Sequence, residues 1–211
     1  MMAYNSTEFI EAEVPILVRA LFPQALSAAY QAVEDLVNEN PILQVPSFQK
    51  GDLIAAATDF ALYNLVNSKR WPDVTASWEW FSRPTGRYLE IRTKNARTSV
   101  SQLTFIDQPP RHAIFRKNAR FYNQRFLFEE MTPPSTDIPH LVIGHGYQDL
   151  AFIVVGMPHP DKPDVWLDRS KNVFDELYVI ENGLAPVEAA DAEAVLSLKE
   201  LIKKQAKEYG A

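Results

Sequence analysis

The chain has 211 residues, of which 46% are hydrophobic and 23% charged, with 27 acidic against 21 basic side chains and no cysteine. This composition is typical of a soluble globular protein, and the absence of cysteine excludes disulfide scaffolds, cysteine-ligated metals and thiol nucleophiles. No apolar run approaches the roughly 18 residues of a membrane span, and the acidic first residues lack a signal-peptide pattern. We therefore expect one globular domain, residues 1–211, in the cytoplasm and without a membrane partner.

Apolar residues at helical spacing predict a helical layer over residues 5–70. Pro15 interrupts this layer, and Pro23 suits the first turn of a second helix. A third helix, residues 52–69, is apolar almost all round, which predicts burial on more than one side. Asp59 lies inside this helix. A carboxylate in such a place must be hydrogen-bonded or paired, and pairing with an arginine is expected before a catalytic role.

The middle of the chain, residues 77–126, predicts strands and then a helix. The segments SWEWFSR and GRYLEIRTK flank the turn sequence Pro84-Thr85-Gly86 and indicate a β-hairpin, and RTSVSQLTFI continues as a third strand. After two prolines, residues 112–125 fit a short helix with an aromatic stripe and a basic face. A strand is the competing interpretation of this segment.

The last third of the chain predicts further strands and a final helix. Two apolar runs rich in β-branched residues, HLVIGHGY and LAFIVVGMP, indicate inner strands within residues 140–180. The next segment, VWLDRSKNVFDELYVIENG, is ambiguous, and we expect a turn or short helix before a strand at ELYVI. Residues 187–209 predict a C-terminal helix, acidic at its start and rich in lysine at its end. The expected fold is α+β, with N-terminal helices, a central mainly antiparallel or mixed β-sheet, and this C-terminal helix.

Charge is segregated along the chain. Residues 83–125 carry 10 basic and 2 acidic side chains, whereas the segments before and after them carry net charges of −6 and −8. Eight of the 10 basic residues are arginine, which favours planar, bidentate contact with phosphate or carboxylate. Either these arginines pair with carboxylates inside the fold, or they form a face that binds anions.

The anion-binding interpretation uses more of the sequence. Phosphates require basic side chains on one surface and exposed bases require aromatic ones, and the basic segment interleaves both types. We therefore expect a non-catalytic binding or accessory protein that needs no cofactor and contacts an anionic partner. Nucleic acid is the leading candidate, and an acidic protein or self-association is the other partner considered. The expected contact residues are Arg92, Lys94, Arg97, Arg116, Lys117 and Arg120.

A metal-dependent nuclease is the enzymatic alternative. The predicted elements follow the α-β-β-β-α-β order of restriction-endonuclease-like nucleases, a resemblance of order alone. Those enzymes hold Mg²⁺ on an Asp and an (E/D)-x-K motif on neighbouring strands. The nearest counterpart here is Glu90-Ile91-Arg92, in which arginine cannot perform the proton transfer of a lysine. Asp73 or Glu79 would complete a Mg²⁺ site with Glu90.

The histidines and the common catalytic fingerprints give no stronger enzymatic signal. Motifs for dinucleotides, nucleoside triphosphates, zinc proteases and α/β-hydrolases are absent. His140 and His145 lie in one predicted strand at an odd spacing, so they face opposite sides and no metal site is expected. The default expectation is that the histidines lie at loop ends and are satisfied by hydrogen bonds.

A protein-interaction or assembly subunit is the second alternative. An acidic frame around an arginine-rich strip suits self-association or an acidic protein partner. Tryptophans are common anchors of interfaces when they are exposed. The candidates are Trp71, Trp78, Trp80 and Trp166.

Overall fold

The computed structural model describes residues 5–39, 47–80, 86–111, 113–126, 138–180 and 200. In these ranges the chain begins with helices α1 (Ser6–Glu13), α2 (Ile16–Arg19), α3 (Phe22–Glu39) and α4 (Ser47–Asn67). Strands β1 (Thr75–Trp80), β2 (Arg87–Arg92) and β3 (Arg97–Leu103) follow, and then helix α5 (Ile114–Arg120) with the 3₁₀ helix η2 (Phe121–Phe126). The last described elements are strands β4 (His140–Gly146), β5 (Ile153–Pro158) and β6 (Trp166–Arg169), and helix α6 (Val173–Ile180).

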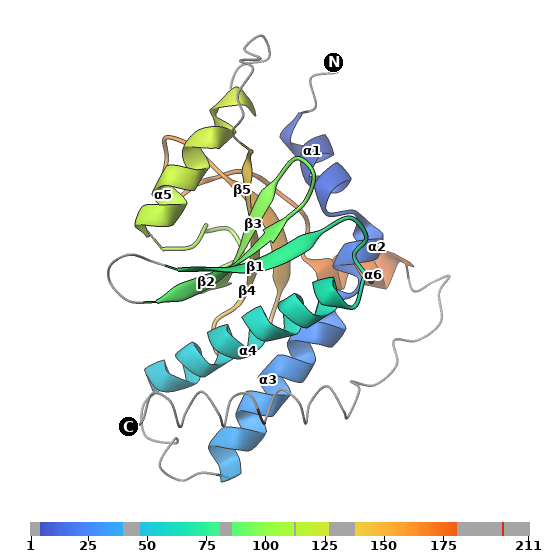
Figure 1. Cartoon of the computed structure of the whole chain (residues 1–211), viewed down its shortest axis with the longest axis vertical. Helices are drawn as coiled ribbons and strands as arrows, with labels where there is room; N and C mark the ends of the chain where they lie inside the picture. Colours follow the sequence, from blue (N-terminus) through green and yellow to red (C-terminus); the bar gives the residue numbers. More distant parts are fainter. Residues whose placement is uncertain are drawn as a thin grey trace.

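The strands form a six-stranded mixed sheet in the order β1-β2-β3-β4-β5-β6. Neighbouring strands are antiparallel, except that β3 and β4 are parallel. Parallel neighbours cannot be joined by a tight turn. The connection between β3 and β4 therefore crosses one face of the sheet, and it carries α5 and η2 (Figure 1).

The predicted α+β class, with N-terminal helices and a mixed sheet, is confirmed. The hairpin of β1 and β2 is also confirmed, and the segment after the third strand is helical as expected. Of the predicted C-terminal helix, residues 187–209, only Glu200 lies within the described residues, and it is helical. The turn residues Pro84 and Thr85 lie outside the described residues.

The expected strand at ELYVI is wrong, because this segment lies in α6, whereas the strand β6 precedes it. Asn172 caps the helix: its side-chain oxygen accepts a hydrogen bond from the backbone N–H of Phe174 at 3.3 Å. Asp175 and Glu176 then occupy the first turn, where carboxylates complement the helix dipole. These start signals outweigh the β-propensity of Tyr178, Val179 and Ile180.

The sheet is covered differently on its two faces. One face contributes Leu89, Ile91 and Leu141, among others, to the main hydrophobic core shared with α1, α3 and α4. The opposite face packs a smaller cluster that includes Leu103 and Trp166 and lies on the side of α5. None of the described helices is both long and apolar enough to cross a membrane.

The turn between β2 and β3 is held by the first helix. Glu13 at the end of α1 is buried, and its carboxylate accepts hydrogen bonds from the hydroxyl of Thr93 and, at 2.7 Å, from the side-chain amide of Asn95. Because Arg92 and Arg97 flank this turn and pair with each other in the sheet, Glu13 fixes the place where two of the predicted contact residues lie.

Arg19 in α2 connects this helix to α1 and α6, although it is only 1% exposed. Its guanidinium donates to the carboxylate of Glu11 in α1 at 2.8 Å and to that of Glu176 in α6 at 2.9 Å. It also donates to the backbone oxygen of Val14 at 2.8 Å. The buried charge is therefore paired and hydrogen-bonded on every side, as a structural buried charge must be.

Replacing Arg19→Ala should lower the free energy of unfolding by about 3 kcal/mol, because it leaves Glu176 partly buried without its cation. Arg70→Ala is the matched control, since Arg70 is exposed, and it should change stability by less than about 0.5 kcal/mol. Urea denaturation of both variants measures the difference. Equal midpoints for the two variants would contradict the structural role of Arg19.

His145 in β4 is buried between the helices of the main core. Its ring nitrogens lie 2.7 Å from the hydroxyl of Tyr30 in α3 and 3.4 Å from that of Thr58 in α4. Burial lowers the pKa of His145 to about 4, although a backbone hydrogen bond with Gly146 opposes the shift. The imidazole is therefore neutral at physiological pH.

His145 should make the free energy of unfolding fall as the pH decreases from about 6.5 to about 4. In this window the unfolded chain, whose histidines titrate near 6.5, binds a proton that folded His145 does not bind. His145→Gln should reduce the slope of the free energy of unfolding against pH, by up to about 1.4 kcal/mol per pH unit. Urea titrations at several pH values compare the slopes, and identical slopes would contradict the low pKa of His145.

Candidate anion-binding site

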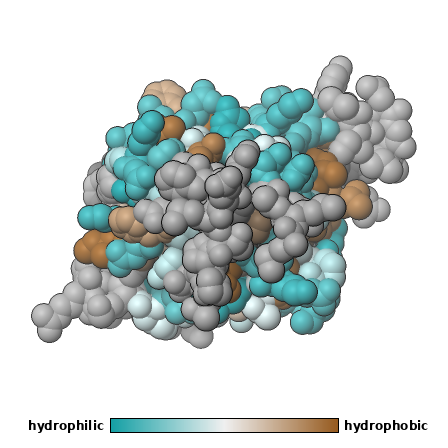
Figure 2. Space-filling view, turned by 90° about the horizontal axis from the view of Figure 1, so that it is seen from above, coloured by the Kyte–Doolittle hydropathy of each residue, from teal (hydrophilic) through white to brown (hydrophobic). Residues whose placement is uncertain are grey.

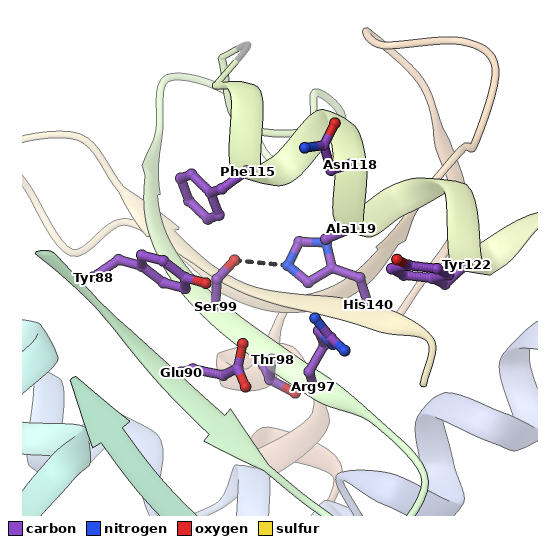
Figure 3. Close-up of a pocket in the computed structure, with 10 residues that line it drawn as sticks. All are labelled: Tyr88, Glu90, Arg97, Thr98, Ser99, Phe115, Asn118, Ala119, Tyr122 and His140. Carbon is purple, nitrogen blue, oxygen red and sulfur yellow. Dashed lines mark hydrogen bonds between the residues drawn. The ribbon is translucent and has the colours of Figure 1, made fainter. Parts of the chain in front are cut away.

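A pocket of about 220 Å³ lies between α5 and the sheet face of β2, β3 and β4 (Figure 3). Aromatic rings from β2, α5 and η2 form part of its wall, and polar side chains from the three strands form the rest. The residues that line it are Tyr88, Glu90, Arg97, Thr98, Ser99, Phe115, Asn118, Ala119, Tyr122 and His140.

The strand register explains why polar side chains meet here. Glu90 is paired with Ser99 across β2 and β3, and Arg97 is paired with His140 across β3 and β4. Residues two apart in a strand share a face, and paired residues on neighbouring strands lie side by side. The four side chains therefore lie together on the face of the sheet that α5 covers (Figure 3).

His140 forms the floor of the pocket and is 2% exposed. Its Nε2 lies 3.0 Å from the hydroxyl of Ser99, whereas its Nδ1 has no hydrogen-bond partner among the described residues. The expectation that the histidines are satisfied by hydrogen bonds is therefore wrong for one nitrogen of this ring. Burial lowers the pKa of His140 to about 3, and the positive charges of Arg116 and Arg97 lower it further. At neutral pH the ring is a hydrogen-bonding group and a poor general base.

Asn123 in η2 holds the crossover against the sheet. Its side-chain amide donates to the backbone oxygens of His140 at 3.1 Å and Pro158 at 2.8 Å, and it accepts from the backbone N–H of His140 at 2.8 Å. Asn123 is fully buried. Its polar groups are thus used inside the protein, and the residue positions His140 instead of contacting a ligand.

Two arginines lie close to His140 without a carboxylate partner among the described residues. Arg97 lines the pocket with its guanidinium 5.5 Å from the ring of Tyr122, and its Nε is buried without a hydrogen-bond partner. Arg116 lies over the ring of Phe115 at 4.9 Å and donates to the hydroxyl of Ser101 at 3.3 Å. Burial lowers the pKa of Arg116. The pocket therefore has a positive end.

The carboxylate of the pocket, Glu90, is already neutralised. It accepts a hydrogen bond from Nε of Arg92 at 3.2 Å, and the hydroxyl of Tyr88 is also hydrogen-bonded to it. Burial raises the pKa of Tyr88, and the charges of Glu90 and Glu79 raise it further, so this hydroxyl stays protonated. An incoming anion therefore meets a compensated Glu90.

The aromatic wall has a defined geometry. The rings of Tyr88 and Phe115 are stacked, with centroids 4.3 Å apart and planes inclined by 21°. Tyr122 closes the other side, under the guanidinium of Arg97. Phe115, Ala119 and Tyr122, which belong to the stripe predicted for this helix, face inward. They line a pocket instead of filling a core.

The remaining predicted contact residues differ in exposure. Lys94, in the turn before β3, and Lys117, on α5, are exposed, and neither forms an ion pair with a described carboxylate. Arg120 is only 9% exposed, does not line the pocket, and has an Nε without a partner among the described residues. Its burial therefore differs from the exposed basic helix face expected for it.

The nuclease candidates are only partly brought together. The order α4, β1, β2, β3, α5, β4 is the predicted one, and Glu79 shares the sheet face of Glu90 across β1 and β2. Asp73 lies in the exposed turn before β1. Among the described residues no group of three or more His, Asp or Glu side chains could hold a metal ion.

The tryptophans offer little for an interaction surface. Trp71 and Trp166 are buried, and Trp78 lies between Tyr63 and Arg87. Trp80, at the end of β1, is 72% exposed. Seen from above (Figure 2), the described surface is mainly hydrophilic, with hydrophobic residues in separate small patches.

Asp59 of α4 lies on the other side of the sheet, near β2. Desolvation raises the pKa of Asp59 to about 8, although a hydrogen bond with the backbone of Leu89 and the charge of Arg87 oppose the shift. The carboxyl group is therefore largely protonated at neutral pH. The nearby arginine agrees with the expected structural role, but the pair is not within ion-pair distance.

Periodicity predicts the shared face within each strand, but the neighbouring positions of β3 and β4 bring Arg97 beside His140. These residues are 43 positions apart, and no local pattern in the sequence indicates that their strands pair in parallel.

Comparisons of the chain with protein-family models, with curated protein sequences and with solved structures found no match.

Proposed function

We propose that the protein binds nucleic acid, without cleaving it, through a basic face on β2, β3, α5 and the turn after β2. The basic face consists of five of the six predicted contact residues, Arg92, Lys94, Arg97, Arg116 and Lys117; the sixth, Arg120, is buried. The observation that carries the proposal is the lack of internal neutralisation: among the described residues, Arg92 alone of the six forms an ion pair.

Unpaired cations in and around a pocket favour an anionic partner over a purely structural role. Among the described carboxylates, Glu11 and Glu176 pair with Arg19 and Glu34 pairs with Lys50, and both cations lie outside the basic segment. Two of the basic side chains are partly buried, which removes water that would otherwise screen their charge. A phosphate group supplies the missing counter-charge in the geometry that guanidinium groups prefer.

Aromatic side chains beside these cations favour nucleic acid over other polyanions. Phe121 is 45% exposed and lies next to Tyr122 at the end of α5. Proteins that bind single strands combine a basic groove with aromatic rings on which bases stack. On the face seen in Figure 2 the described residues are mainly hydrophilic with only small apolar patches, which favours a polar partner over a broad apolar protein interface there.

Binding to oligonucleotides should weaken as salt increases. Fluorescence anisotropy of labelled single- and double-stranded oligonucleotides, titrated at several salt concentrations, measures this dependence. The slope of log K against log[salt] should be about −0.7 to −0.9 for each phosphate contacted. The double variant Lys94→Ala with Lys117→Ala should weaken binding and make this slope less negative, because each substitution removes up to one phosphate contact.

The matched control is Lys69→Ala with Arg70→Ala, which removes two exposed charges at the end of α4. It should bind as tightly as the unaltered protein. If both double variants lose affinity equally, the effect is one of net charge and the basic face has no special role. Absence of binding by the unaltered protein at about 50 mM salt would contradict the proposal outright.

Labelled oligonucleotides should stay intact when Mg²⁺ is added, because the Glu90 carboxylate is occupied by Arg92 and Tyr88. Denaturing gel electrophoresis after incubation with Mg²⁺ measures this. Cleavage that needs Mg²⁺ and disappears in Glu90→Gln would replace the binding proposal by the nuclease alternative.

A further inference from the structure

The pocket contains polar groups that the protein itself leaves unsatisfied. Nδ1 of His140 and Nε of Arg97 are both buried and have no hydrogen-bond partner among the described residues. Buried polar groups in folded proteins are nearly always hydrogen-bonded, and each exception requires an explanation. Both residues line the same pocket, so one bound molecule could satisfy both.

The charges around these groups indicate an anionic ligand. Arg97 lines the pocket and Arg116 lies close enough to His140 to affect its pKa, whereas Glu90 is compensated by Arg92. The Nε–H of Arg97 is a permanent donor, and in the neutral ring of His140 an Nδ1–H can donate to an oxyanion while Nε2 accepts from the hydroxyl of Ser99. The part of the pocket lined by Arg97, Ser99 and His140 therefore suits a compact oxyanion.

The rest of the pocket indicates what the oxyanion is attached to. The stacked rings of Tyr88 and Phe115 form one side of the pocket, the ring of Tyr122 closes the opposite side, and the amide of Asn118 lies at the rim (Figure 3). A volume of about 220 Å³ is below the range of about 300–1,000 Å³ typical of sites for larger ligands. The pocket therefore suits one phosphate with part of a single nucleoside attached to it, and is too small for a dinucleotide.

We infer that this pocket binds the phosphate monoester of a single nucleotide, with the phosphate against Arg97, Ser99 and His140 and the ring against Tyr88 and Phe115. The inference rests on the proposed function, because it assigns one nucleotide to a pocket that lies within the proposed nucleic-acid-binding face. The same chemistry has two sources, a free nucleoside monophosphate and the phosphorylated end of a strand. In both cases the bond to phosphate stays intact, because the site supplies no base for hydrolysis.

Isothermal titration calorimetry with adenosine 5′-monophosphate and with adenosine tests the phosphate requirement. The monophosphate should bind at least about tenfold more tightly, the difference expected for a charge-assisted hydrogen bond. Arg97→Gln should abolish the difference, and Ser99→Ala should reduce it. Equal binding of the two compounds, or binding of neither, would overturn the inference.

The variants also separate a ligand role from a structural one. Because Nε of Arg97 has no partner, Arg97→Gln should melt at the same temperature as the unaltered protein or higher. A large loss of thermal stability would show that Arg97 supports the fold, and would overturn its role as a ligand-binding residue. Lys69→Ala with Arg70→Ala, far from the pocket, should bind the monophosphate normally.

Labelled single strands with a 5′-phosphate, a 3′-phosphate or neither distinguish the two sources. A preference of about tenfold for one phosphorylated end, lost in Arg97→Gln, supports capture of a strand end. Binding of the monophosphate without any preference among strands supports the free nucleotide. If strands bind with no end preference and the monophosphate does not bind, this inference fails while the proposed function stands. If the monophosphate binds and strands do not, the proposed function fails while the pocket still binds a nucleotide.

Discussion

The parallel pairing of β3 with β4 is the constraint on which the pocket depends. Every other neighbouring pair of strands is antiparallel, but this pair requires a crossover, and the crossover places α5 and η2 over one face of the sheet. Asn123 then holds the crossover down by bonding the backbone at the start of β4 and the end of β5. With a short hairpin in its place, Arg97 and His140 would face water, where neither the low pKa of the histidine nor the unsatisfied nitrogens would arise.

Arg19, which is buried, and Arg97, which is partly buried, differ in how the protein neutralises their charges. Arg19 donates to two carboxylates and a backbone oxygen, so its charge is fully compensated within the protein. Arg97 is half-buried, but its Nε donates to no described group. An uncompensated buried donor lowers stability, and proteins retain such groups mainly where a ligand completes the site. The contrast within one molecule is the reason to assign Arg19 to the fold and to propose binding for Arg97.

Much of the fold could be predicted from periodicity, because local rules act within one element. The helical layer, the hairpin and the opposite facing of His140 and His145 all follow from spacing along the chain, and the structure confirms them. The strand expected at ELYVI failed because the cap at Asn172 outweighed β-propensity. The site was harder to predict, since it depends on which strands become neighbours. Arg120 and Asn123 resemble surface residues in the sequence, but both are buried in the fold.

The exposed and buried cations of the basic face are suited to different tasks. Lys94 and Lys117 are exposed to water and salt, so salt screens their charges and their attraction to phosphate is weak. Arg97 and Arg116 lie where water is largely removed, so their contribution is short-ranged, stronger and dependent on geometry. The neutral ring of His140 between them adds no third positive charge, which would repel the other two. Under the proposal, an anion that reaches the pocket meets Arg97 and a polar floor, with Arg116 close to His140, so the pocket would select by shape where the outer lysines select only by charge.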